Sequence, residues 1–137
     1  MDTLTRMLNS HPQANTAGPN AGAIGEALQA LLVCASACTS CADACLGEER
    51  VAAMRRCIRL NLDCADVCEA SARLLTRYTE TDWDIVRGQL ESCVVACRAC
   101  GAECERHAAR MEHCRICADA CQACETACND LVVALRA

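Results

Sequence analysis

Twelve of the sixteen cysteines in this 137-residue chain follow one repeated template, C-x3-C-x2-C-x3-C. Steps of four and three residues put every thiol of a run on one face of an α-helix, because about 3.6 residues make a turn. Cys114 adds one such step before the last run. The template positions are Cys34, Cys38, Cys41 and Cys45, then Cys93, Cys97, Cys100 and Cys104, and then Cys117, Cys121, Cys124 and Cys128.

A fourth run keeps the same spacing but carries an amide at one thiol position. Its members are Cys57, Asn61, Cys64 and Cys68. The asparagine marks either a site of lower metal demand or a hydrogen-bonding spacer, and the sequence leaves both open. Together the runs predict four helices with a thiol face each, packed around a core lined with sulfur.

Thiols at this spacing favour soft metal ions over disulfides. Thiolates select Cu(I), Zn(II), Cd(II) or iron–sulfur clusters. Residues three or four apart on a helix have Cβ atoms about 5–6 Å apart, whereas a disulfide requires about 3.8 Å. Residues 1–20 contain no apolar core of an export signal, so we expect a cytoplasmic protein, and cytosolic thiols stay reduced.

The charge of the metal ions distinguishes between the candidates, because it must balance the negative charge of the thiolates. Four-ligand sites would hold about four Zn(II), whose charge leaves about half of sixteen thiolates uncompensated, and unpaired buried charge is costly. About one Cu(I) per cysteine, with each thiolate bridging two ions, brings the core close to neutrality. A linear site would place its two sulfurs roughly 4.5 Å apart, which suits positions i and i+4. We therefore predict several Cu(I) ions per chain.

Three alternatives stay open at this point. The closest is a metallothionein-like zinc or cadmium buffer. A thiol-exchange protein would need an exposed cysteine of low pKa near a helix N-terminus, and Cys114 alone is placed for that. Buried cysteines can also be simple small apolar residues, but sixteen in register make that interpretation weak. A bacterial iron–sulfur run of the form C-x2-C-x2-C-x3-C-P is absent.

The elements that must position these thiols are four helices joined by short connections. Short connections make sequential helices antiparallel, so we predict an all-α, up-down-up-down four-helix bundle with a Cys-lined core and a short N-terminal helical extension. Gly47 is a candidate C-terminal cap and Asp82 a candidate N-terminal cap. Residues 1–20 form the extension and linker, and 21–137 form the bundle. The predicted helices cover about 23–46, 48–78, 81–110 and 112–135.

The two ends of the predicted bundle differ in chemistry. Continued toward one end, the thiol faces become aliphatic, with Ile24, Leu28, Leu31, Leu75, Val86, Leu90, Leu131 and Leu135. Toward the other end the same faces carry Met54, His107, Met111 and His113. Imidazole and thioether groups are also ligands of soft cations. We therefore predict a closed aliphatic end and an open, metal-binding mouth.

Composition excludes other classes. The net charge of -5 and the pI near 5.1 argue against nucleic acid or an anionic membrane as partner, since both require a basic surface. No apolar run is expected to approach membrane-spanning length. The chain has no Phe, one Trp and one Tyr, so aromatic packing does not fill the core. With the core committed to sulfur, we expect no enzymatic activity.

The repeated C-x3-C pairs on all four helices and the His/Met-lined end resemble the bacterial copper storage proteins, in their cytosolic branch. The resemblance covers about residues 20–137. It implies Cu(I) stored in bulk along the bundle core, ions that enter at the open end, and bundles that associate into a homotetramer. Copper would be exchanged with a copper chaperone or a small thiol carrier. The run from Cys57 to Cys68 departs from the pattern, because it holds three thiols rather than four.

Overall fold

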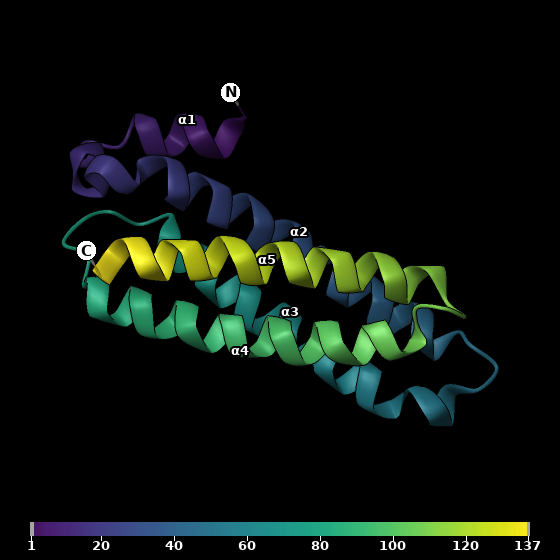
Figure 1. The fold of residues 1–137 in the computed structure, drawn as a ribbon. Helices are drawn as coiled ribbons and strands as arrows, with labels where there is room; N and C mark the ends of the chain where they lie inside the picture. Colours follow the sequence, from purple (N-terminus) through teal and green to yellow (C-terminus); the bar gives the residue numbers. More distant parts are fainter. Residues whose placement is uncertain (1, 137) are drawn as a thin grey trace.

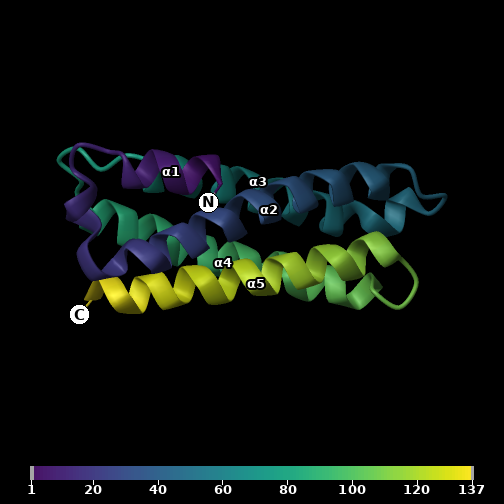
Figure 2. The same cartoon turned by 90° about the horizontal axis from the view of Figure 1, so that it is seen from above.

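Four long helices lie side by side and alternate in direction, as Figure 1 and the turned view in Figure 2 show. The computed structural model describes residues 2–136, and within that range it contains helices and turns but no strand. A short helix, α1, precedes the bundle, and 3-10 turns cover Ala14–Asn20 and Val51–Met54. The predicted four-helix bundle is confirmed. The helices are α1 (Thr3–Asn9), α2 (Ala21–Leu46), α3 (Arg55–Leu75), α4 (Trp83–His107) and α5 (Glu112–Arg136).

Local sequence explains where two of these helices begin and end. At the end of α2, the backbone N–H of Gly47 donates to the carbonyls of Asp43 and Ala44. At the start of α4, the side chain of Asp82 accepts from the N–H groups of Asp84 at 3.0 Å and Ile85 at 3.4 Å. Such a cap satisfies backbone donors that the first turn leaves open. Both predicted caps are confirmed.

The connection between α2 and α3 is longer than the sequence predicted. The second helix of the bundle begins at Arg55 rather than residue 48, because 47–50 form a turn and Val51–Met54 a 3-10 segment. The chain needs these residues to reverse direction and to place Met54 inside the bundle, where it is buried. Similarly, α4 ends at His107 instead of residue 110.

The N-terminal extension and the linker after it pack on the bundle. Its 3-10 turn leads directly into α2, and the turn includes Gly18 at φ 52°, a conformation that favours glycine. In α1, Leu8 is buried and Leu4 packs against the core, so that α1 lies along α2 (Figure 1). The ring of His11 meets Tyr78 edge-on with the centroids 5.5 Å apart.

The aliphatic end is closed as expected. Seven of its eight predicted side chains are buried, and Leu135 is half-buried against them. Leu8 and Ala17 from the extension belong to the same apolar cluster. This end is therefore filled by methyl groups and covered by the N-terminal segment.

One sequence expectation about hydropathy is wrong. The segment Ala14–Leu46 is long and apolar enough to cross a membrane by length and composition alone. Ten residues of α2 are buried, and they include Leu28, Leu31 and the four cysteines of this helix. In this structure the segment consists of a 3-10 turn, Ala14–Asn20, and the bundle helix α2.

Candidate metal centre

All sixteen cysteines are free, and each is at most 2% exposed. They lie on α2, α3, α4 and α5 and point into the space that these helices enclose. The predicted convergence of the thiol faces on a common core therefore occurs. Burial removes these sulfurs from water and places them beside one another, which is the arrangement that a multinuclear thiolate site requires.

Pairs four residues apart on one helix bring their sulfurs close together. The Sγ–Sγ distances are 3.8 Å for Cys34 and Cys38, 3.9 Å for Cys64 and Cys68, 3.9 Å for Cys93 and Cys97, and 4.0 Å for Cys124 and Cys128. A linear two-sulfur site needs roughly 4.5 Å. Small rotations about the side-chain bonds would be enough to admit an ion between each pair.

Sulfurs from different helices are equally close, so the pairs form a continuous network. Cys68 illustrates this, since its Sγ lies 3.7 Å from Cys93, 3.8 Å from Cys97 and 3.9 Å from Cys124. At the other side of the core, Cys38 lies 3.9 Å from Cys100 and 3.7 Å from Cys121. Thiols such as Cys68 and Cys38 can therefore serve two neighbouring ions.

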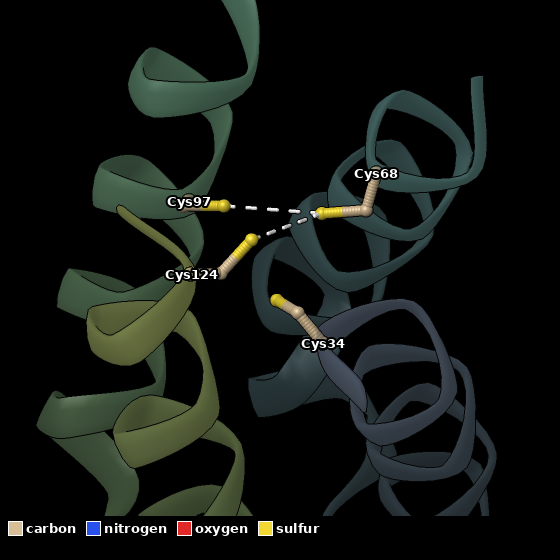
Figure 3. A group of neighbouring side chains, drawn as sticks. All are labelled: Cys34, Cys68, Cys97 and Cys124. Atoms are coloured by element: carbon tan, nitrogen blue, oxygen red, sulfur yellow. Dashed lines mark hydrogen bonds between the residues drawn. The ribbon is translucent and has the colours of Figure 1, made fainter. Parts of the chain in front are cut away.

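Several groups of four thiols converge closely enough to share metal ions. One group draws a single thiol from each bundle helix, and Figure 3 shows its four sulfurs turned toward one another. Cys34 belongs to two of the groups and so links them. Within each group all sulfurs lie within 4.8 Å of one another; the groups are Cys34, Cys68, Cys97 and Cys124; Cys34, Cys38, Cys64 and Cys121; Cys38, Cys100, Cys117 and Cys121; and Cys41, Cys45, Cys57 and Cys114.

Asn61 is a hydrogen-bonding spacer inside the sulfur core. Its side chain is fully buried. The Nδ2 group donates to the backbone carbonyl of Cys57 at 2.8 Å and lies 3.3 Å from the Cys57 sulfur. The Oδ1 atom accepts from the thiols of Cys117 at 3.0 Å and Cys100 at 3.2 Å. The structure thus favours the second of the two interpretations that the sequence left open.

A cavity of about 480 Å³ lies at the end of the bundle opposite the aliphatic cluster. Met54, His107 and Met111 line it, together with the turn after α2 and Arg110. Met54 is buried and Met111 is half-buried. Three of the four side chains predicted for the mouth therefore border one open space.

The fourth, His113, lies between the solvent and the outermost thiols. Its Nδ1 atom is 3.4 Å from the sulfur of Cys41 and 3.6 Å from that of Cys114. Its Nε2 atom lies 3.1 Å from a carboxylate oxygen of Glu48. An imidazole nitrogen thus adjoins the four-thiol group nearest the mouth.

His107 also has a carboxylate partner. Its Nε2 atom lies 2.9 Å from Glu103, which is 7% exposed. Arg106 and Arg56 lie 3.4 Å and 4.0 Å from the same carboxylate and compensate its charge. Neither glutamate was predicted from the sequence as part of the site. The spacing of Glu103 four residues before His107 could have indicated a contact, whereas Glu48 lies in a turn and gave no such signal.

Burial affects the ionisation of the thiols near the mouth. It raises the pKa of Cys114 to about 11, with a further contribution from the neighbouring Cys57. Burial is also the main cause of the raised pKa of Cys45. A thiol-exchange site needs an exposed cysteine of low pKa. Because Cys114 is buried and its pKa is raised, the thiol-exchange hypothesis for this residue is wrong.

The raised pKa of Cys114 predicts that the reduced, metal-free protein loses stability in alkali. A group whose pKa is higher in the folded state stabilises the fold at pH values below its pKa in the unfolded chain, which is 9.0 for Cys114. This stabilisation is lost as the pH rises through about 11. We expect the midpoint of thermal unfolding, followed by circular dichroism under anaerobic conditions, to fall as pH rises from 9 toward 11. A midpoint that stays constant over this interval would contradict the burial of protonated thiols.

Comparison with known proteins gives a consistent result. The copper storage protein Ccsp of Streptomyces lividans, loaded with 10 copper equivalents, matches with a TM-score of 0.93 and 46% sequence identity, covering 96% of this chain and 98% of that one. A second structure, described as a cytosolic copper storage protein from the same organism with five coppers, matches with a TM-score of 0.81 and 50% identity, covering 82% and 93% of the two chains.

Another relative is the uncharacterized cysteine-rich protein YhjQ of Bacillus subtilis. It is 33% identical over 104 residues, which cover 76% of this chain and 91% of the relative. The sequence model of the copper storage proteins matches residues 21–133, which include all four bundle helices up to the last turn of α5. The chain therefore belongs to the copper storage protein family.

Proposed function

We propose that this protein stores Cu(I) in the cytoplasm, as thiolate complexes inside the bundle. The observation that carries the proposal is the convergence of sixteen buried, free thiols with neighbouring sulfurs 3.7–4.0 Å apart. The family to which the chain belongs and the copper-loaded relatives from Streptomyces lividans support it. The store would protect the cell from free Cu(I) without any chemical turnover.

The charge of the core favours Cu(I) over divalent ions. A buried thiolate is costly unless a cation compensates it. With roughly one Cu(I) for each cysteine, every thiolate can bridge two ions and the core approaches neutrality. The zinc or cadmium alternative is not favoured, because divalent ions in separate four-sulfur sites would not use the continuous network in which Cys34 and Cys38 each belong to two groups.

The mouth provides a route for entry. An incoming Cu(I) would first meet Met54, His107 and Met111 at the cavity. It would then pass to His113 and the outermost thiols, and from there to sulfurs deeper in the bundle. Each thiol that becomes a ligand must lose its proton, so uptake releases protons to the solvent. All sixteen cysteines are proposed ligands, and the two histidines and two methionines are proposed entry ligands.

The partners follow from the same proposal. A copper chaperone or a small thiol carrier would deliver and remove the ions at the mouth. Association into a homotetramer is proposed from the family resemblance. Exposed apolar side chains on neighbouring helices, Val95 on α4 and Ile116 on α5, are available for such contacts. Nucleic acids and membranes are not among the proposed partners, given the acidic composition.

Anaerobic titration of the reduced protein with Cu(I) tests the proposed function. We expect binding to continue well beyond four ions and to approach roughly one Cu(I) per cysteine, because bridging thiolates allow that ratio. The bound metal is measured after gel filtration by atomic absorption, and free Cu(I) by a coloured chelator. A parallel titration with Zn(II) is the control. Saturation at or below about four Cu(I), the capacity of separate four-sulfur sites, would contradict bulk storage.

A further inference from the structure

Both imidazoles near the mouth have their Nε2 atom against a carboxylate. The distances are 3.1 Å from His113 to Glu48 and 2.9 Å from His107 to Glu103. An ionised carboxylate only accepts hydrogen bonds, so the proton must lie on Nε2 of each ring. In the neutral imidazole this leaves the lone pair on Nδ1, which is then the nitrogen available to a metal ion.

For His113 the structure also shows where the available nitrogen lies. Nδ1 is 3.4 Å from the Cys41 sulfur and 3.6 Å from the Cys114 sulfur. These two thiols form a group with Cys45 and Cys57 in which all sulfurs lie within 4.8 Å of one another. The ring therefore spans from a carboxylate on the solvent side to four thiols on the core side.

The carboxylate and the ring come from different parts of the chain. Glu48 follows α2 in the turn that leads to the Val51–Met54 segment, whereas His113 lies in the first turn of α5. Among the described residues 2–136, Glu48 is the hydrogen-bond partner at the outer edge of this half-buried ring. The turn after α2 thus fixes a ring that α5 supplies.

We propose that Glu48 is a positioning residue for copper entry. It holds His113 in the Nε2–H tautomer and in the orientation that presents Nδ1 to the first Cu(I) ions at Cys41, Cys45, Cys57 and Cys114. A carboxylate is a hard ligand and suits soft Cu(I) poorly, so Glu48 acts through the imidazole and does not bind the ion itself. Metal-binding histidines commonly donate their second N–H to such a partner. The proposal rests on the proposed function for the identity of the ion.

The chain offers a matched control in the next residue. Glu49 carries the same charge, lies in the same turn and is exposed to solvent. Replacing either glutamate with alanine removes one negative charge near the mouth. Only Glu48→Ala removes the hydrogen bond to His113. Any difference in behaviour between the two variants therefore reports the loss of the Glu48–His113 hydrogen bond and not the loss of a negative charge.

The first experiment examines the full-length, reduced, metal-free protein with 15N-labelled histidine. The nitrogen chemical shifts of His113 report which ring nitrogen carries the proton. We expect Nε2–H alone in the wild type and in Glu49→Ala, and a mixture of both tautomers in Glu48→Ala. An unchanged tautomer in Glu48→Ala would overturn the proposal. This readout does not depend on how many ions the core holds, so it stays informative even if bulk storage is refuted.

The second experiment measures the affinity for the first equivalents of Cu(I) by competition with a coloured chelator. We expect Glu48→Ala to weaken binding about 10–100-fold, which is typical of losing a partner behind a metal-binding histidine. Glu49→Ala should change it less than about twofold, because an exposed charge contributes little. The total capacity should be the same in all three proteins, since Glu48 is not a ligand.

A double-variant comparison separates positioning from direct attraction of the cation. If Glu48 acts only through the ring, Glu48→Ala should have no further effect on the affinity in a His113→Ala background. An equal loss in both backgrounds would show that Glu48 acts on the ion without His113 and would overturn the proposal. The same would follow if Glu49→Ala weakened binding as much as Glu48→Ala.

Discussion

Cu(I) loading is expected to raise the thermal unfolding midpoint far above that of the reduced, metal-free protein. A ligand that binds only the folded state stabilises it by about 4.1 kcal/mol when its free concentration is 1,000 times the dissociation constant. Several ions bound between α2, α3, α4 and α5 each contribute stabilisation of this kind, because each group of thiols joins different helices. Anaerobic calorimetry at increasing copper content measures the effect.

The control for this result is the same protein with an excess of Zn(II). We expect a smaller rise with Zn(II), since divalent ions leave more of the buried negative charge uncompensated or more thiols unused. If full loading with Cu(I) left the midpoint unchanged, the ions would have to be bound outside the folded core. Proteolysis followed over time under the same conditions provides an independent check.

The Leu31→Ala substitution is expected to destabilise the metal-free protein by about 2–5 kcal/mol, as is usual when a buried leucine is truncated in a packed core. Leu31 is 0% exposed and belongs to the aliphatic cluster at the closed end. With no phenylalanine in the chain, this cluster has few large side chains that could fill the cavity. Urea unfolding of the reduced protein measures the free energy of unfolding.

The neighbouring residue gives a chemically identical comparison. Leu32 is 37% exposed, so less apolar surface is withdrawn from water there, and Leu32→Ala should cost clearly less than Leu31→Ala. Cu(I) loading should restore much of the stability of Leu31→Ala, because the thiols that hold the ions are unchanged. An equal decrease in the free energy of unfolding for the two variants would mean that the closed end is not tightly packed in the metal-free bundle.

The helical faces were predictable from the sequence because one simple geometry determines them. Steps of three and four residues place thiols on one side of a helix in any bundle, and all sixteen are buried as expected. The closed end follows from the same periodicity. The caps at Gly47 and Asp82 were predictable because capping depends on local hydrogen bonds.

What the sequence did not reveal depends on contacts between distant segments. Residues 48–54 carry no strong helix breaker after Gly47, yet they turn because α3 must return antiparallel to α2. Glu48 contacts His113, which is 65 residues further along the chain, and no local pattern encodes such a pair. The role of Asn61 likewise depends on thiols from α4 and α5, namely Cys100 and Cys117.

The closed end has a consequence for the order of exchange. On the proposed function, ions enter and leave the core through the mouth, because the opposite end is closed. The ion bound most recently is therefore the first to be released. Copper bound nearest the aliphatic end would then exchange slowly. Copper bound beside the imidazoles would exchange rapidly. One bundle would in this way both bind a sudden excess of copper and release copper slowly, without a conformational change.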